Sequence, residues 1–130
     1  MKLARLSLYV MAAVFLGLGA MSLVVPTNLT RLVEISMPTP IAVMEIRGVY
    51  GGLFIGIGFF FLLFARRAAW LRPGLVAQAG IMAGFVVGRT VGILLGGAPN
   101  LFIAALLAGE VFMVAVAVFA LRGLNGSPAV

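Results

Sequence analysis

The chain of 130 residues is 64% hydrophobic and only 9% charged, with nine Lys or Arg against three Asp or Glu. A soluble domain averages about 45–50% apolar and about 25% charged residues, so this composition excludes a protein that is exposed to water on all sides. Because the chain has neither Cys nor His, disulfides, thiolate or imidazole metal sites and His-ligated haem are excluded as well. We therefore predict an integral membrane protein that carries no metal site and no cofactor.

Four apolar runs are long enough to cross a membrane as helices. They cover residues 6–25, 46–64, 75–95 and 101–121. A helix of about 20 residues spans a hydrocarbon core of about 30 Å, whereas a spanning strand would need only about 10 residues of alternating polarity. The predicted fold class is an all-α membrane protein, an antiparallel four-helix transmembrane bundle that forms a single domain over residues 1–130.

The first run follows two cations and resembles the start of a signal peptide. It is about twice the length of a signal-peptide core and has no clear cleavage site, so we expect it to remain as a membrane anchor. Between the first two runs, residues 28–36 are expected to form a short helix that begins at Thr27 or Asn28 and ends before Pro38. This helix would lie on the membrane surface or cap the bundle.

Two short connections join the remaining runs. Pro73 and Gly74 are expected to end the connection that precedes the third run. Residues 96–100 are expected to form a tight turn, which makes the last two runs an antiparallel hairpin. The tail, residues 122–130, is expected to be a mobile chain end.

Six cations fall on one side of the predicted membrane, and no acidic residue accompanies them: Lys2, Arg5, Arg66, Arg67, Arg72 and Arg122. On the opposite side, two arginines are matched by two glutamates. The positive-inside rule assigns the cationic side to the cytoplasm, so both termini are expected there, in a multi-pass protein of the bacterial inner membrane. We interpret these cations as a topological signal and expect no binding of nucleic acid.

Glycines recur every four residues in the second and third runs, a spacing that places them on one helix face. Small residues there let helix backbones approach closely. Gly51 and Gly58 form a further row on the second run, whereas its Phe54, Phe60 and Phe61 are expected to face lipid. The glycine zippers serve either packing within the chain's own bundle or a dimer seam. The predicted packing residues are Gly48, Gly52, Gly56, Gly80, Gly84, Gly88 and Gly92.

Arg89 in the third run and Glu110 in the fourth lie deep within their spans. Counted from the turn between these runs, they are about 9 Å and about 14 Å deep. A charge at the centre of a span costs about 2.5–3.5 kcal/mol, so the two are expected to meet inside the bundle. This intramembrane salt bridge either fixes the register of the hairpin or forms the floor of an outward-facing ligand pocket, with Glu45 and Arg47 at its mouth.

Short motifs on three of the runs resemble those of an uncharacterised family. "RGVYGG" opens the second run, "GR" lies late in the third, and a Glu lies inside the fourth, at positions Arg47, Gly51, Gly52, Gly88, Arg89 and Glu110. The pattern is similar to that of a bacterial four-helix membrane family described as a domain of unknown function. The layout is more loosely similar to that of DoxX-like membrane proteins. The resemblance implies the four-helix topology and a role for these polar positions, with no established activity.

Three classes of function are compatible with this pattern. The first is a small membrane binding or accessory subunit, whose pocket takes a lipid headgroup, a quinone, a small anion or a partner protein. The second is a small transporter, although the small multidrug exporters rely on a Glu in the first span, where this chain has none. The third is a lipid-modifying enzyme, for which no nucleophile is apparent. We expect the first class and no enzyme, with membrane lipids as partners and a homo-oligomer or larger membrane complex as the assembly.

The predicted topology can be tested with reporter fusions. A reporter joined after Arg67 and one joined after Arg122 should both be active on the cytoplasmic side, because an even number of spans separates each position from a cytoplasmic N-terminus. An outside signal at Arg122 would mean an odd number of crossings and would contradict the four-span prediction.

Overall fold

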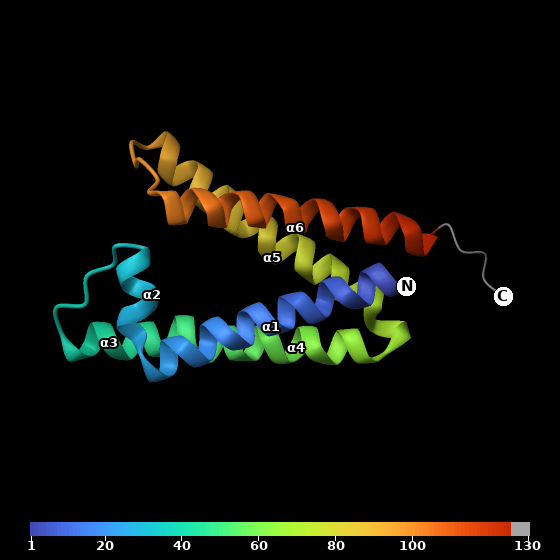
Figure 1. Ribbon diagram of the computed structural model, residues 1–130, viewed down its shortest axis with the longest axis horizontal. Coiled ribbons are helices and arrows are strands. Elements are labelled where there is room, and N and C mark those ends of the chain that lie inside the picture. Colours follow the sequence, from blue (N-terminus) through green and yellow to red (C-terminus); the bar gives the residue numbers. More distant parts are fainter. Residues whose placement is uncertain (126–130) are drawn as a thin grey trace. The chain divides into compact units, whose positions relative to one another are not determined.

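Helices and the loops between them make up residues 1–125, the part that the computed structural model of the protein describes, and this part contains no strand (Figure 1). The helices in chain order are α1 (Lys2–Val24), α2 (Pro26–Leu32), α3 (Pro40–Ile46), the π-helical η1 (Arg47–Leu53), α4 (Phe54–Arg66), the 3₁₀ turn η2 (Ala68–Trp70), α5 (Leu71–Leu94) and α6 (Leu101–Asn125). Four helical stretches are long and apolar enough to cross a membrane: Lys2–Val24, Pro40–Arg66, Ala68–Leu94 and Leu101–Leu124. The predicted fold class, all-α with four spanning helices, is confirmed.

The second and third spans begin earlier than predicted. The second begins with α3, because the Thr39 side chain accepts a hydrogen bond from the Ala42 N–H at 3.2 Å and Pro40 occupies the first helical position. In the third, Pro73 lies in the first turn of α5, where its missing N–H leaves no helix hydrogen bond unmade. The connection therefore ends before Pro73, and the predicted starts at residues 46 and 75 were too late.

The short helix between the first two spans is present as α2, although it ends at Leu32 rather than near Ser36. Glu34 follows with a positive φ of 58°, in the left-handed region that ends a helix. At the other end of the chain, α6 continues to Asn125. The start of the predicted mobile tail is thus helical, and its residues 126–130 lie outside the described part.

The chain forms two compact units. The first, here called the C-terminal unit, combines Met1–Leu8 with the residues from Leu63 onward, and so contains α5, α6 and the first turns of α1. The second, the N-terminal unit, is Tyr9–Leu62 and contains the rest of α1 together with most of α4. Each unit has its own packing, which is described separately below, and the single-domain organisation expected from the sequence stays a prediction.

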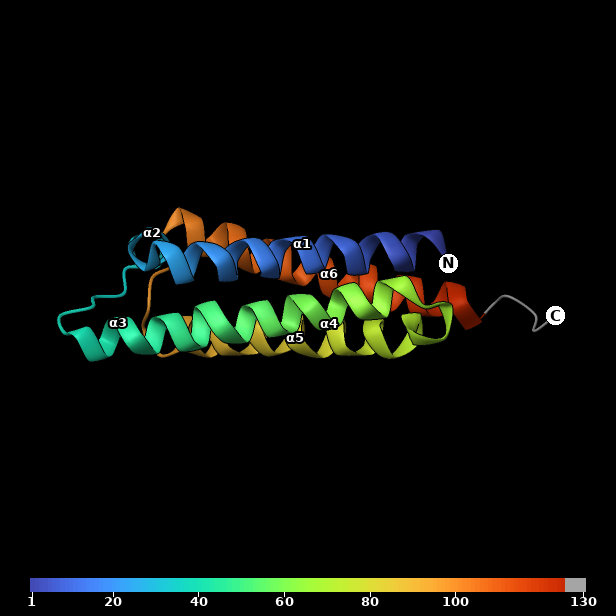
Figure 2. The same ribbon diagram turned by 90° about the horizontal axis from the view of Figure 1, so that it is seen from below.

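In the N-terminal unit, α1 and the η1–α4 helix run antiparallel with their backbones close together (Figure 2). Leucines of α1 fit over glycines of the partner helix: a methyl group added at Gly58 would lie 2.7 Å from Leu16 Cγ, and one added at Gly51 would lie 2.6 Å from Leu23 Cδ2. The fit is reciprocal, because a methyl group at Gly19 of α1 would lie 2.8 Å from Ile55. We call this contact the glycine seam.

Aromatic rings fill the seam between the glycine contacts. The Phe15 ring of α1 lies 5.1 Å from the Phe54 ring and 5.9 Å from the Phe61 ring, measured between centroids. Phe61 is only 1% exposed, whereas Phe60 is 59% exposed. The prediction that Phe54 and Phe61 face lipid was therefore wrong, because they share one stripe with Gly51 and Gly58 at spacings of three and four residues.

The glycine rows predicted to pack do not form these contacts. A methyl group at Gly48 or Gly56 would meet no atom within 4 Å, and one at Gly52 would meet only the Arg47 carbonyl oxygen, at 4.0 Å. On α5, a methyl group added at any glycine of the row would meet no atom within 4 Å: Gly80, Gly84, Gly88 and Gly92. Within the C-terminal unit, this row is therefore not the face by which α5 contacts α6. Its use as a packing surface stays a prediction.

The C-terminal unit is an antiparallel hairpin of α5 and α6 that also holds the start of α1. The Gln78 side chain is fully buried and joins three helices, because its Oε1 accepts from Ser7 Oγ at 2.9 Å and its Nε2 donates to the Met113 carbonyl at 3.0 Å. Next to this network, Gly74 lies against Leu8 and Phe64 so closely that a methyl group would be 2.9 Å and 2.7 Å from them.

The glycine seam predicts that an alanine substitution destabilises the protein at Gly58 but not at Gly56 of the same helix. Gly58→Ala should lower the free energy of unfolding by about 1–3 kcal/mol, the usual penalty of overpacking, because its methyl group would be 2.8 Å from the Leu16 backbone N. Gly56→Ala has open space at the same point and removes the same backbone freedom, so it is the matched control. Unfolding in SDS mixed micelles, followed by circular dichroism, measures both. Equal effects would mean that the seam does not hold α1 to α4.

Candidate functional site

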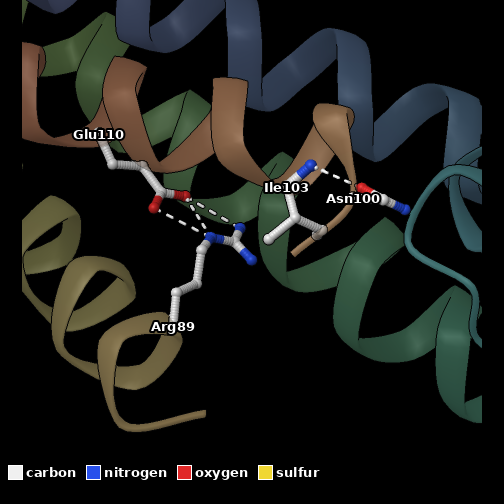
Figure 3. Close-up of polar contacts among 4 residues, drawn as sticks. All are labelled: Arg89, Asn100, Ile103 and Glu110. Carbon is white, nitrogen blue, oxygen red and sulfur yellow. Dashed lines mark hydrogen bonds and ion pairs between the residues drawn. The ribbon is translucent and has the colours of Figure 1, made fainter. Parts of the chain in front are cut away.

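Arg89 of α5 and Glu110 of α6 form a two-point ion pair (Figure 3). Arg89 Nη2 donates to Glu110 Oε1 at 2.9 Å, and Arg89 Nε lies 3.0 Å from Oε2 and 3.1 Å from Oε1. Both residues belong to the C-terminal unit, so the structure brings together the two charges that the sequence placed within the spans. Charge-assisted pairs of this kind are among the strongest hydrogen bonds in proteins.

The turn between the two helices sets the level at which these side chains meet. Gly96 has a φ of 108°, which favours glycine, and ends α5. Asn100 then starts α6, because its Oδ1 accepts from the Ile103 N–H at 2.9 Å. Counted from the last residue of α5, Arg89 lies about 8 Å along that helix, and counted from the first residue of α6, Glu110 lies about 14 Å along that one. Side chains lean toward the N-terminus of their own helix, so the two lean toward each other in an antiparallel hairpin.

The ion pair is partly buried. The Glu110 side chain is 10% exposed and that of Arg89 is 25% exposed. The guanidinium also lies over the Phe85 ring, with 5.8 Å between Cζ and the ring centroid. Arg89 is therefore held by a carboxylate along one edge and by an aromatic ring one turn earlier on its own helix.

Glu110 uses one edge of the guanidinium, formed by Nε and Nη2, while the Nη1 group points away from the carboxylate (Figure 3). An arginine has five N–H donors, and Glu110 accepts from one at Nε and one at Nη2. The donors on the far edge remain available to a second acceptor. Because the carboxylate already balances the charge, that acceptor can be a neutral carbonyl oxygen as well as an anion.

Glu45 and Arg47, the predicted mouth of the pocket, lie in the N-terminal unit. Glu45 is exposed in the last turn of α3. Arg47 begins η1, and its Nε donates to the main-chain carbonyl of Leu23 at 3.1 Å. That carbonyl belongs to the last turn of α1, where helix carbonyls lack partners within the helix and a cation is favoured. Arg47 thus caps α1, a role that the sequence analysis did not foresee, and the four-residue pocket stays a prediction.

The Gln78 network is the polar cluster that the sequence analysis missed. Gln78 lies on the same face of α5 as Arg89, eleven residues earlier, and its contact with Ser7 was not predicted. A serine in an otherwise apolar span is the signal that could have pointed to it, since a hydroxyl in a membrane span needs an acceptor. Both ends of the Gln78 amide are used inside the C-terminal unit, so this side chain stabilises the fold.

The four apolar helices, two of which share a partly buried ion pair, define a multi-pass membrane protein. Comparison with protein families assigns it more narrowly. The chain belongs to the family DUF4345, described as a domain of unknown function, whose model matches residues 3–121. The resemblance found in the sequence is therefore confirmed, and the match includes the residues of the ion pair. No curated protein and no solved structure matches the chain.

The ion pair predicts non-additive effects of substitution. Arg89→Leu or Glu110→Leu alone should lower the free energy of unfolding by about 3–5 kcal/mol, because each leaves an uncompensated charge in a span. The double substitution should be milder than the worse single one, since it removes both charges. Unfolding in SDS mixed micelles again gives the four values of the cycle. A double variant as damaged as the sum of the singles would show that the two residues are not coupled.

Proposed function

We propose that the protein is a small membrane binding or accessory subunit, and that Arg89, held by Glu110, is the group that contacts its ligand. The proposed ligand carries an acceptor oxygen at the depth of the pair: a lipid headgroup, a quinone, a small anion or a carbonyl of a partner protein. The protein is proposed to act in the bacterial inner membrane with both termini in the cytoplasm, and not as an enzyme.

The observation that carries this proposal is the unequal use of the two edges of the guanidinium. A purely structural ion pair needs only the carboxylate that Arg89 already contacts. The far edge, with Nη1 pointing away from Glu110 (Figure 3), keeps polar N–H groups within a span. Such groups are unfavourable in lipid unless they find an acceptor, and the partial exposure of the Arg89 side chain gives an acceptor access to them.

The two other classes of function receive less support. A transporter needs a polar route through the membrane, but the nearest polar side chain on this face of α5 is Gln78, which is fully buried with both ends of its amide bonded. A hydrolytic enzyme needs a free base, whereas both oxygens of Glu110 accept from Arg89. A protein that holds a ligand without moving or changing it agrees best with these contacts.

Ligand-induced stabilisation tests the proposal. The full-length protein in a nonionic detergent is titrated with three probes, inorganic phosphate, short-chain phosphatidylglycerol and decylubiquinone, and its unfolding temperature is measured. At least one probe should raise this temperature for the wild type, because a ligand that binds only the folded state stabilises it. The rise should be absent in the double variant Arg89→Gln/Glu110→Gln, which removes both charges and so leaves neither one stranded.

Thr90→Val is the matched control, since it removes a polar group from the next residue of α5, which is exposed. This variant should respond to the probes as the wild type does. If no probe stabilises the wild type, or if the double variant responds equally, the pair serves only to fix the hairpin.

A further inference from the structure

Among the described residues, the side chains at one end of the C-terminal unit carry only positive charge. Its six cations, the basic end, come from the first turns of α1, the α4–α5 connection and the last turns of α6 (Figure 2), and all are exposed: Lys2, Arg5, Arg66, Arg67, Arg72 and Arg122. The three acidic residues of the chain lie elsewhere, at positions 34, 45 and 110. Because these cations terminate spanning helices, they lie at the depth of lipid headgroups.

Within the basic end, the guanidinium of Arg67 is fixed by its surroundings. Its Cζ lies 5.1 Å from the centroid of the Trp70 ring, three residues further along the chain. The main-chain N–H of Trp70 donates to the main-chain carbonyl of Arg67 at 3.0 Å, which closes the η2 turn. The Phe64 ring contacts the indole edge-on at 6.1 Å between centroids. The turn and the two rings thus restrict a side chain that would otherwise be mobile.

A guanidinium that lies over an aromatic ring keeps its N–H groups free, because they point outward in the guanidinium plane. Such an edge matches two oxygens of a phosphate. Beside it, Trp70 is 40% exposed, as is typical of a tryptophan at the membrane interface. The N–H edge of the Arg67 guanidinium matches the phosphate of a phospholipid, and the neighbouring apolar ring of Trp70 matches the start of its acyl chains.

We propose that Arg67 and Trp70 form a binding site for an anionic phospholipid, with Arg67 on the phosphate and Trp70 against the upper acyl chains. Arg66 and Arg72, the neighbouring cations in sequence, add the positive potential that selects anionic over zwitterionic lipids. A free phosphate would not use the exposed indole, and an acidic protein segment would not need a site at headgroup depth. The site is independent of the Arg89 proposal, and either can fail without the other.

Trp70 is the only tryptophan of the chain, so its fluorescence reports on this site alone. The full-length protein is placed in vesicles of phosphatidylcholine, and quenching is compared when either brominated phosphatidylcholine or brominated phosphatidylglycerol is added. Both lipids offer a phosphate to Arg67, but the choline cation of phosphatidylcholine is repelled by the neighbouring Arg66 and Arg72, so brominated phosphatidylglycerol should occupy the site about tenfold more strongly. Arg67→Gln should abolish this preference, and Arg67→Lys, which keeps the charge but lacks the planar edge, should reduce it.

Arg122→Gln is the control, because it removes a cation from the same end but from a different helix. It should leave the preference intact, and circular dichroism should show unchanged helicity in all variants. Equal loss in the Arg67 and Arg122 variants would show a diffuse attraction and overturn the proposal. It would also be overturned if Arg67→Gln kept the preference, or if inorganic phosphate changed the fluorescence while neither lipid was preferred.

Discussion

A polar group inside a membrane span must find its partner within the protein, and this constraint determines where the helices of each unit meet. In the C-terminal unit, Arg89 and Glu110 satisfy each other across the α5–α6 hairpin, while Gln78 joins α1, α5 and α6 through Ser7 and a main-chain carbonyl. Each contact fixes the level of one helix against another. Apolar burial gives no comparable driving force between helices in lipid, because lipid tails solvate apolar side chains as well as a neighbouring helix does.

Main-chain groups follow the same constraint in the N-terminal unit. Arg47 reaches the Leu23 carbonyl at the end of α1, and the Thr30 hydroxyl donates to the Pro26 carbonyl within α2. Among the described buried side chains, only the Ser22 hydroxyl has no hydrogen-bond partner. Close backbone contact supplies the remaining stability, because Gly19, Gly51 and Gly58 let α1 and α4 approach to a distance at which dispersion between their atoms is strong.

The sequence predicted the number and type of the spans because hydropathy over about 20 residues depends on bilayer thickness and not on tertiary contacts. Helix starts were less predictable, since α3 begins at a local cap, Thr39, well before the apolar run. The contact face of the η1–α4 helix was predicted in part, because the row of Gly51 and Gly58 was recognised, whereas Phe54 and Phe61 were assigned to lipid. Glycine rows mark two candidate faces about 100° apart on a helix, and the choice between them depends on where Leu16 and Leu23 project from α1.

The residues of the candidate site also differ in how well the sequence predicts their contacts. The meeting of Arg89 and Glu110 follows from the length of the turn and the lean of side chains along each helix, and both are readable from the sequence. The partner of Arg47 is a carbonyl of the main chain, and no side-chain pattern reveals which carbonyls at a helix end lack a donor in the folded chain. Polar residues that recognise backbone are therefore the ones that pattern-based reasoning places least well.

The glycine seam also limits how α1 can move. Leu16 lies over Gly58 and Leu23 over Gly51. The two leucines are seven residues apart on α1, and the two glycines are seven residues apart on the η1–α4 helix. A slide of α1 along its axis by one residue, about 1.5 Å, would press both leucines onto backbone atoms at the same moment. The two contacts therefore oppose a sliding motion of α1 along the η1–α4 helix, and the motions of α1 that they leave open are bending and tilting.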